Sequence, residues 1–197
     1  MKEKEEYLGN VKNILKRIDA ISDVSNKLLY LLSSINSYLE SKGIGRMIIV
    51  GGFAVELYSG GTYRTGDIDI IIENARASKI VREILKEIGF ERTGRIYLSE
   101  EFLEKAIDIV GVVYDKPKEP VKIEINNFWI YILPPEETII SCLNAFKHWN
   151  SDVDFEKSAM VLKAQEKRID WEYLERRARE EGVIEELRRI RDLVSSI

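Results

Sequence analysis

The chain has 197 residues and a mass of 22.8 kDa, which fits one medium-sized domain or one domain with a helical appendage. Its hydrophobic content of 45% is ordinary for a packed protein and excludes a largely disordered chain. No run of about 18 apolar residues is present, which excludes a transmembrane helix. The charged start MKEKEEYLGN has no apolar segment of the kind that a signal peptide needs. One cysteine and one histidine exclude an internal disulfide and a Cys/His zinc site. We therefore expect a cytoplasmic protein with no membrane partner.

The charge balance excludes binding of nucleic acid through a general positive field. The 30 basic and 34 acidic residues give a net charge of -4. A basic cluster between residues 176 and 191 is interleaved with glutamates, which is typical of an exposed, salt-bridged helix face.

Both ends of the chain are predicted to be helical. Residues 3–42 show two apolar stripes at helical spacing, and residues 135–197 show several more, with Asp154 and Asp170 as expected N-caps. The expected division is into N-terminal helices over residues 1–45, a core over 46–133 and a C-terminal helical region over 134–197.

The middle of the chain alternates between β-rich and helical patterns. Strands are predicted over residues 47–50, 67–73, 96–98 and 106–110, and helices over 53–58 and 77–88. The pair Asn126-Asn127 tolerates positive φ, so 121–125 and 128–133 are expected to form a hairpin. This order predicts an α/β fold, in the broad α+β sense, with a sheet flanked by helices.

Two carboxylates at the start of one strand carry the first chemical signal. Because strand side chains alternate, Asp67 and Asp69 project from one face, about 7 Å apart along the backbone. Two neighbouring carboxylates repel each other unless a cation lies between them. Oxygen ligands favour Mg²⁺ or Mn²⁺, and Mg²⁺ commonly binds one or two carboxylates together with substrate phosphates. The residue types therefore fit a metal ion that accompanies a nucleoside triphosphate (NTP).

A glycine pair supplies the second signal. Gly51 and Gly52 follow a buried strand and precede a short helix. The N-terminus of a helix offers free N–H groups and a positive dipole end, and glycine lets a phosphate approach the backbone closely. We therefore expect the β and γ phosphates at this turn.

The segment from Ile48 to Glu73, IIVGGFAVELYSGGTYRTGDIDIIIE, resembles the signature of the polymerase-β-like nucleotidyltransferase superfamily. That signature is a glycine pair, a short helix and Asp-x-Asp at the start of a strand. Here 14 residues separate Gly52 from Asp67. The sequence GGFAVEL…YRTGDIDIII is most similar to the AbiEii-type branch of toxin–antitoxin proteins. The resemblance implies a mixed sheet of the nucleotidyltransferase fold.

The resemblance also implies a third carboxylate on a later strand. Asp108, in AIDIVG, is the favoured candidate because a bare charge in mid-strand is costly without a partner. Glu124, in KIEIN, is the alternative, although its surroundings are typical of a solvent-facing hairpin.

Further contacts are expected from Arg64, which can neutralise phosphate charge, from Thr65 and from Lys147. Related AbiEii-type sequences often carry a Lys after the Pro-Pro-Glu segment and an Asp on the next helix. Cys142 and Lys157 align with those places, and Lys147 and Asp154 are the nearest substitutes.

The resemblance implies a metal-dependent nucleotidyltransferase. It would transfer a nucleoside monophosphate from an NTP such as ATP to a hydroxyl group and release pyrophosphate. Asp67, Asp69 and Asp108 would bind Mg²⁺ or Mn²⁺, and Asp108 would help to deprotonate the attacking hydroxyl. The acceptor is left open between tRNA or another RNA, a protein and a small molecule. Two alternatives remain: a toxin–antitoxin component that acts through a partner protein, and a nucleotide-binding domain without turnover.

Overall fold

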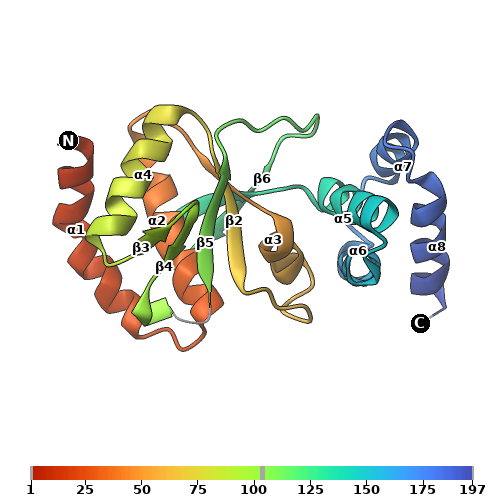
Figure 1. Cartoon of the computed structure of the whole chain (residues 1–197), viewed down its shortest axis with the longest axis horizontal. Helices are drawn as coiled ribbons and strands as arrows, with labels where there is room; N and C mark the ends of the chain where they lie inside the picture. The colour runs from red at the N-terminus through yellow and green to blue at the C-terminus, as the bar shows by residue number, and fades with distance from the viewer. Residues whose placement is uncertain (1, 103–104, 197) are drawn as a thin grey trace. The chain divides into compact units, whose positions relative to one another are not determined.

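The computed structural model describes residues 2–102 and 105–196 (Figure 1). These residues form two compact units. The first, here called the sheet unit, combines the chain up to Val50 with Gly66–Asp115 and Pro120–Ile132. The second, here called the helical unit, combines Gly51–Thr65, Lys116–Glu119 and the chain from Leu133 onward. The three-part division expected from the sequence stays a prediction.

One mixed sheet organises the described part of the sheet unit. Its seven strands lie in the order β3-β4-β5-β2-β1-β7-β6. β2 pairs in parallel with β5 and antiparallel with β1, and β1 pairs in parallel with β7. The strands are β1 (Met47–Val50), β2 (Asp67–Ile72), β3 (Glu91–Thr93), β4 (Ile96–Leu98), β5 (Ala106–Gly111), β6 (Val121–Ile125) and β7 (Phe128–Ile132). The predicted fold class, a mixed sheet with flanking helices, is confirmed.

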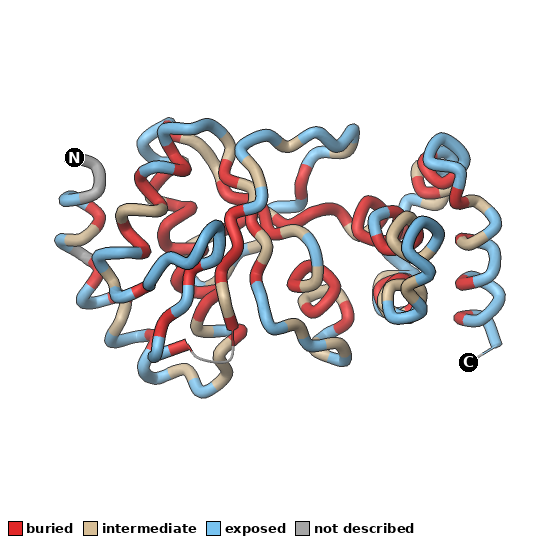
Figure 2. Tube along the Cα trace, in the orientation of Figure 1, coloured by how far each residue is buried: buried red, intermediate tan, exposed pale blue. Residues whose placement is uncertain are grey.

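The helices α2 (Val24–Ser41) and α4 (Ala75–Glu87) pack on this sheet, α1 (Lys2–Asp19) packs against them, and a short 3₁₀ helix (Glu100–Phe102) precedes β5. α2 contacts β6 and β7, and α4 contacts β2 and β3. The three helices therefore form one layer. Figure 2 shows burial concentrated along the central strands and α2.

Alternation in β2 fixes which side chains are buried. Ile68, Ile70 and Ile72 are fully buried, whereas Asp67 is exposed and Asp69 is half-buried. Side chains alternate between the two faces of a strand, so burying the three isoleucines directs both carboxylates to the opposite face. The hydrophobic core of the sheet unit therefore positions the acidic pair.

The helical unit has its own core. Apolar side chains of α3 (Gly51–Tyr58), α5 (Pro135–Trp149), α6 (Asp152–Gln165), α7 (Trp171–Glu180) and α8 (Ile184–Ser195) form one buried cluster that includes Val55, Leu143, Leu162, Leu174 and Ile190. The stripes predicted over residues 135–197 face this cluster.

Two buried glutamates at the start of α5 tie the helical unit together. Glu137 accepts from Arg177 Nε at 2.9 Å, and Glu136 accepts from the backbone N–H of Asp170 and from Lys118 Nζ, each at 2.9 Å. Buried carboxylates are costly unless they are paired, so α5, α7 and residues 116–119 are held together by charge as well as by packing.

The structure differs from the sequence predictions at three local points. α3 begins at Gly51 rather than at Phe53, and the short strand β3 was not predicted. The residue that precedes α6 is Ser151, so Asp154 lies inside the helix instead of capping it. Asp170 caps α7 as expected, accepting from Tyr173 N at 3.1 Å. In the described part of the chain, no helix is both long enough and apolar enough to cross a membrane.

Replacing Asn36 by Ala should destabilise the sheet unit. Asn36 is fully buried, accepts from Met47 N at 2.6 Å and donates to Trp129 O at 2.9 Å, which links α2 to β1 and β7. Removing it leaves the buried N–H of Met47 without this partner and leaves Trp129 O with the longer bond from Ser37 Oγ at 3.3 Å, at a cost of about 2 kcal/mol. Urea unfolding followed by circular dichroism measures the loss. Asn13→Ala, at an exposed position of α1, should change stability by less than about 0.5 kcal/mol; equal effects would contradict the interpretation.

Candidate active site

Three carboxylates share one face of the sheet unit. Asp69 on β2 is in register with Asp108 on β5, and Asp67 is in register with Ala106. Residues paired across neighbouring strands point to the same face, and the strands lie about 4.8 Å apart. The structure therefore brings the three predicted carboxylates to one face. Asp108, at 3% exposed, is the most deeply buried of them.

Asp108 is paired with an arginine that the sequence analysis did not select. Arg95 Nε lies 2.7 Å from Asp108 Oδ2. The other oxygen, Oδ1, is buried and has no hydrogen-bond partner among the residues that the structure describes. One half of this carboxylate therefore retains its capacity to accept a proton or to bind a cation.

The donor chemistry of this face fits a divalent cation. All three groups offer carboxylate oxygens, which Mg²⁺ and Mn²⁺ prefer, and Asp108 has an unpartnered buried oxygen. Across residues 2–102 and 105–196, no three Asp, Glu, His or Cys side chains converge closely enough to hold a metal ion. In this arrangement the cation beside Asp108 is the guanidinium group of Arg95.

The glycine turn belongs to the helical unit. Gly51 has φ +60°, in the left-handed region that glycine adopts without strain. A Cβ on Gly52 would lie 2.8 Å from Thr65 Oγ1. Gly51 is thus favoured by its backbone conformation, and Gly52 by the close approach of the Thr65 side chain, independently of any phosphate contact.

A buried glutamate of α3 holds two of the predicted contact residues. Glu56, at 2% exposed, accepts from Arg64 Nη1 at 3.0 Å and from Thr65 N at 2.9 Å. These bonds fix the loop that follows α3 and place Thr65 against Gly52. The charge of Arg64 is partly offset by Glu56.

A cavity of about 230 Å³ within the helical unit is lined by both glycines. Asp154 and Lys157, from α6, are among its lining residues. Lys157 Nζ lies 2.9 Å from Asp154 Oδ1 and 4.9 Å from the centre of the Tyr63 ring. Burial lowers the pKa of Lys157, but its interactions with Asp154 and Tyr63 outweigh burial, so the pKa is raised overall. Lys157 therefore stays positively charged at neutral pH.

Two further residues define the cavity. Trp149, at the end of α5, is 80% exposed, which is unusual for so large an apolar side chain. Cys142 is buried, and burial raises the pKa of its thiol to about 12, so it is a packing residue rather than a nucleophile.

Lys147 and Glu124 lie apart from these groups. Lys147 Nζ donates to the carbonyl of Gly182 and lies 3.9 Å from a Glu186 oxygen. Its contact with nucleotide stays a prediction. Glu124 lies on β6 in register with Trp129, and β1 and β7 separate its strand from β2. The strand order therefore favours Asp108 over Glu124 as the third carboxylate.

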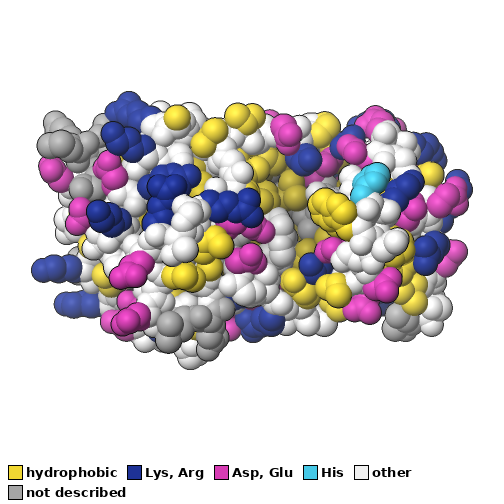
Figure 3. Space-filling view, viewed as in Figure 1, with side chains coloured by type: hydrophobic (Ala, Val, Ile, Leu, Met, Phe, Trp, Pro, Cys, Tyr) yellow, Lys and Arg dark blue, Asp and Glu magenta, His cyan; other side chains and the backbone are white. Residues whose placement is uncertain are grey.

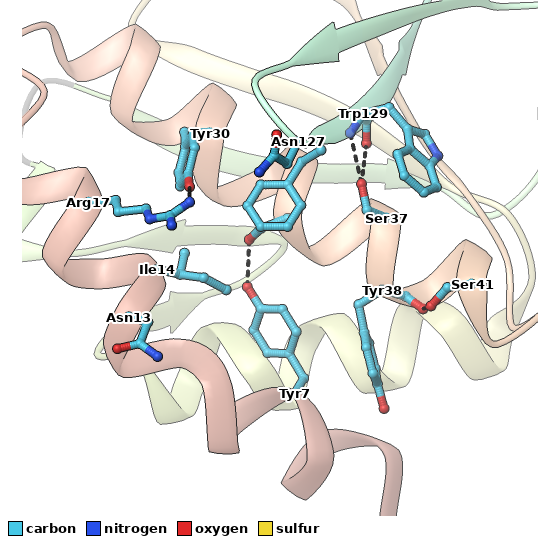
Figure 4. Close-up of a pocket in the computed structure, with 12 residues that line it drawn as sticks. Tyr7, Asn13, Ile14, Arg17, Tyr30, Ser37, Tyr38, Ser41, Asn127 and Trp129 are labelled. Carbon is cyan, nitrogen blue, oxygen red and sulfur yellow. Dashed lines mark hydrogen bonds between the residues drawn. The ribbon is translucent and has the colours of Figure 1, made fainter.

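A second cavity, of about 440 Å³, lies among α1, α2 and the β6–β7 turn (Figure 4). Its lining groups largely satisfy one another. Tyr7 bonds Ser34 at 2.7 Å, and the hydroxyl of Ser37 accepts from Trp129 N at 2.8 Å. None of the three carboxylates lines it.

Sequence reasoning did not select Arg95, Glu56 or Trp149, and it named Asp154 and Lys157 only in comparison with AbiEii-type sequences. The Asp expected on that helix was a usable signal, because it pointed to Asp154, which pairs with Lys157. Arg95 gave none, since its partner is fixed only by the pairing of β4 with β5.

A sheet carrying an acidic pair at a strand start, together with a glycine turn, defines the nucleotidyltransferase class of protein. Residues 26–197 match the family described as "Nucleotidyltransferase of unknown function (DUF6036)", and the chain belongs to that family. No curated protein matches the sequence. The superfamily expected from the sequence is therefore supported, whereas the AbiEii-type branch stays a prediction.

Gly51→Ala should lower the free energy of unfolding by about 1 kcal/mol, because an L-residue is strained at φ +60°. Gly9→Ala is the control. Gly9 lies within α1, has nothing within 4 Å of an added Cβ and should gain about 0.5 kcal/mol. Denaturant unfolding measures both, and a Gly51→Ala protein as stable as the unmodified chain would contradict the assigned strain.

Proposed function

We propose that this protein transfers a nucleoside monophosphate from an NTP to a hydroxyl group and releases pyrophosphate. Membership of a nucleotidyltransferase family supports the reaction class. The observation that carries the proposal is the register of Asp69 with Asp108, which gathers the acidic residues on one face. The chain also links the two halves of the motif, since Val50 pairs with Asp69 and Gly51 is the next residue.

Asp67, Asp69 and Asp108 are the groups that would hold Mg²⁺ or Mn²⁺. Such an ion, when bound, neutralises triphosphate charge and makes the phosphorus atom easier to attack. The unpartnered Oδ1 of Asp108 supports a role at the acceptor side. In the transfer step the acceptor oxygen bonds to the α-phosphorus, the bond to the β-phosphate oxygen breaks, and the hydroxyl proton moves to Asp108 Oδ1.

The glycine turn and the cavity beside it are proposed to bind the nucleotide. Backbone N–H groups at the start of α3 suit phosphates, and Lys157 adds a positive charge. The cavity of about 230 Å³ is small for a complete NTP, since ligand pockets generally measure about 300–1,000 Å³. It suits the base, with the exposed ring of Trp149 as a stacking surface.

Asp69→Asn should lower transfer by about a hundredfold or more while the protein stays folded, because the amide removes charge but keeps the shape. Transfer is measured with each of the four α-labelled NTPs, Mg²⁺ or Mn²⁺, and RNA, protein or small-molecule acceptors. Glu124→Gln, which alters the alternative candidate for the third carboxylate, is the control and should keep full activity. Undiminished transfer by Asp69→Asn would remove Asp69 from the catalytic groups.

Trp149 provides a test of nucleotide binding that needs no turnover. NTP binding should quench tryptophan fluorescence, and Trp149→Phe should abolish most of that quenching and weaken binding about fivefold or more, since stacking contributes about 1–3 kcal/mol. Trp171→Phe, whose ring is not in this cavity, should keep the quenching. Equal quenching in both variants would place the base elsewhere.

A further inference from the structure

We propose that Arg95 is an exchangeable counter-cation for Asp108: it neutralises this carboxylate while no divalent ion is bound, and it leaves when one binds. The inference rests on the proposed function, because it assumes that Asp108 is a metal ligand. It concerns a residue of the β3–β4 hairpin, and all of its evidence lies within the sheet unit.

The hairpin is built to bring Arg95 to Asp108. Gly94 has φ +63° at the turn, and Arg92 Nε donates to its carbonyl at 2.6 Å, which closes the loop. Ile96, the next residue after Arg95, is in register with Asp108 across β4 and β5. The 2.7 Å contact between Arg95 Nε and Asp108 Oδ2 therefore follows from the strand pairing and is not an incidental contact between surface side chains.

The two partners of this ion pair differ sharply in exposure. The side chain of Asp108 is 4% exposed, whereas that of Arg95 is 70% exposed. A buried carboxylate needs a positive partner wherever it lies, but a guanidinium that is mostly in water loses little when it leaves. Arg95 is thus the member of the pair that can be replaced.

The ion pair with Arg95 occupies only one of the two carboxylate oxygens of Asp108. Arg95 contacts Oδ2, and Oδ1 has no partner among the described residues. The unpartnered Oδ1 is therefore available as a ligand for a hard cation. A divalent ion carries twice the charge of one guanidinium, so it would compete with Arg95 for Asp108.

Figure 3 shows Lys and Arg side chains interspersed with Asp and Glu on the side of the sheet unit that carries α4 and the β3–β4 hairpin.

Competition between Arg95 and a divalent ion for Asp108 can be tested without measuring catalysis. Arg95→Gln keeps a hydrogen-bond donor but removes the charge. In the presence of a chelator it should melt about 3 °C or more below the unmodified protein, because Asp108 then lacks a counter-cation. Saturating Mn²⁺ should close that gap, since the ion replaces the lost charge. The affinity for Mn²⁺, measured without nucleotide by titration calorimetry or electron paramagnetic resonance, should rise about threefold to tenfold.

Two control variants separate this role from a structural one. Arg95→Lys keeps the charge and should bind Mn²⁺ about as the unmodified protein does. Arg92→Gln disturbs the same hairpin without touching Asp108, so any loss of melting temperature should be the same with and without Mn²⁺.

An Arg95→Gln protein with the same melting loss in both conditions and unchanged Mn²⁺ affinity would overturn the proposal, because Arg95 would then be structural only. If Arg95→Gln does not fold, Arg95→Lys decides: a threefold to tenfold rise in its Mn²⁺ affinity would also overturn the proposal, since charge would not be the determinant.

Failure of the proposed function would give a different result. The unmodified protein and Asp69→Asn would then both show no response to Mn²⁺, which would end both proposals.

Discussion

Repulsion between carboxylates on neighbouring strands is the constraint on which the rest of this structure depends. Asp69 and Asp108 are in register on parallel strands, and Asp67 lies two residues from Asp69. Carboxylates that face one another on neighbouring strands and are partly buried require a cation nearby. The core of the sheet unit imposes the arrangement, because burying Ile68, Ile70 and Ile72 leaves the acids no other face.

Other buried carboxylates of the chain meet the same requirement in a more permanent way. Glu137 is paired with Arg177, whose side chain is only 10% exposed, and Glu136 bonds a backbone N–H as well as Lys118. These pairs hold helices together and would be costly to break. Arg95 is 70% exposed. Similar Coulombic attraction therefore serves structure in the helical unit and permits exchange in the sheet unit, and solvent access makes the difference.

Most of the fold was predictable because its signals are local. Alternation identified β2, and helical periodicity identified α4 and the C-terminal helices. The glycine pair marked the turn after β1. The prediction failed at element ends and at β3, whose three exposed residues carry no hydrophobic alternation and become a strand only by pairing with β4. Register and neighbouring strands are properties of the whole sheet, so no short window of sequence contains them.

The sequence by itself determined which residue types carry the chemistry: an acidic pair at a strand start and a glycine turn before a short helix. Only the tertiary structure decided their partners. It placed Asp108 beside Asp69 and kept Glu124 on the far edge strand, it joined Lys147 to Gly182, and it brought Arg95 to Asp108. The physical reason is that side-chain periodicity depends on residues a few positions apart, whereas a buried charge is balanced by whichever distant segment the packing brings within reach.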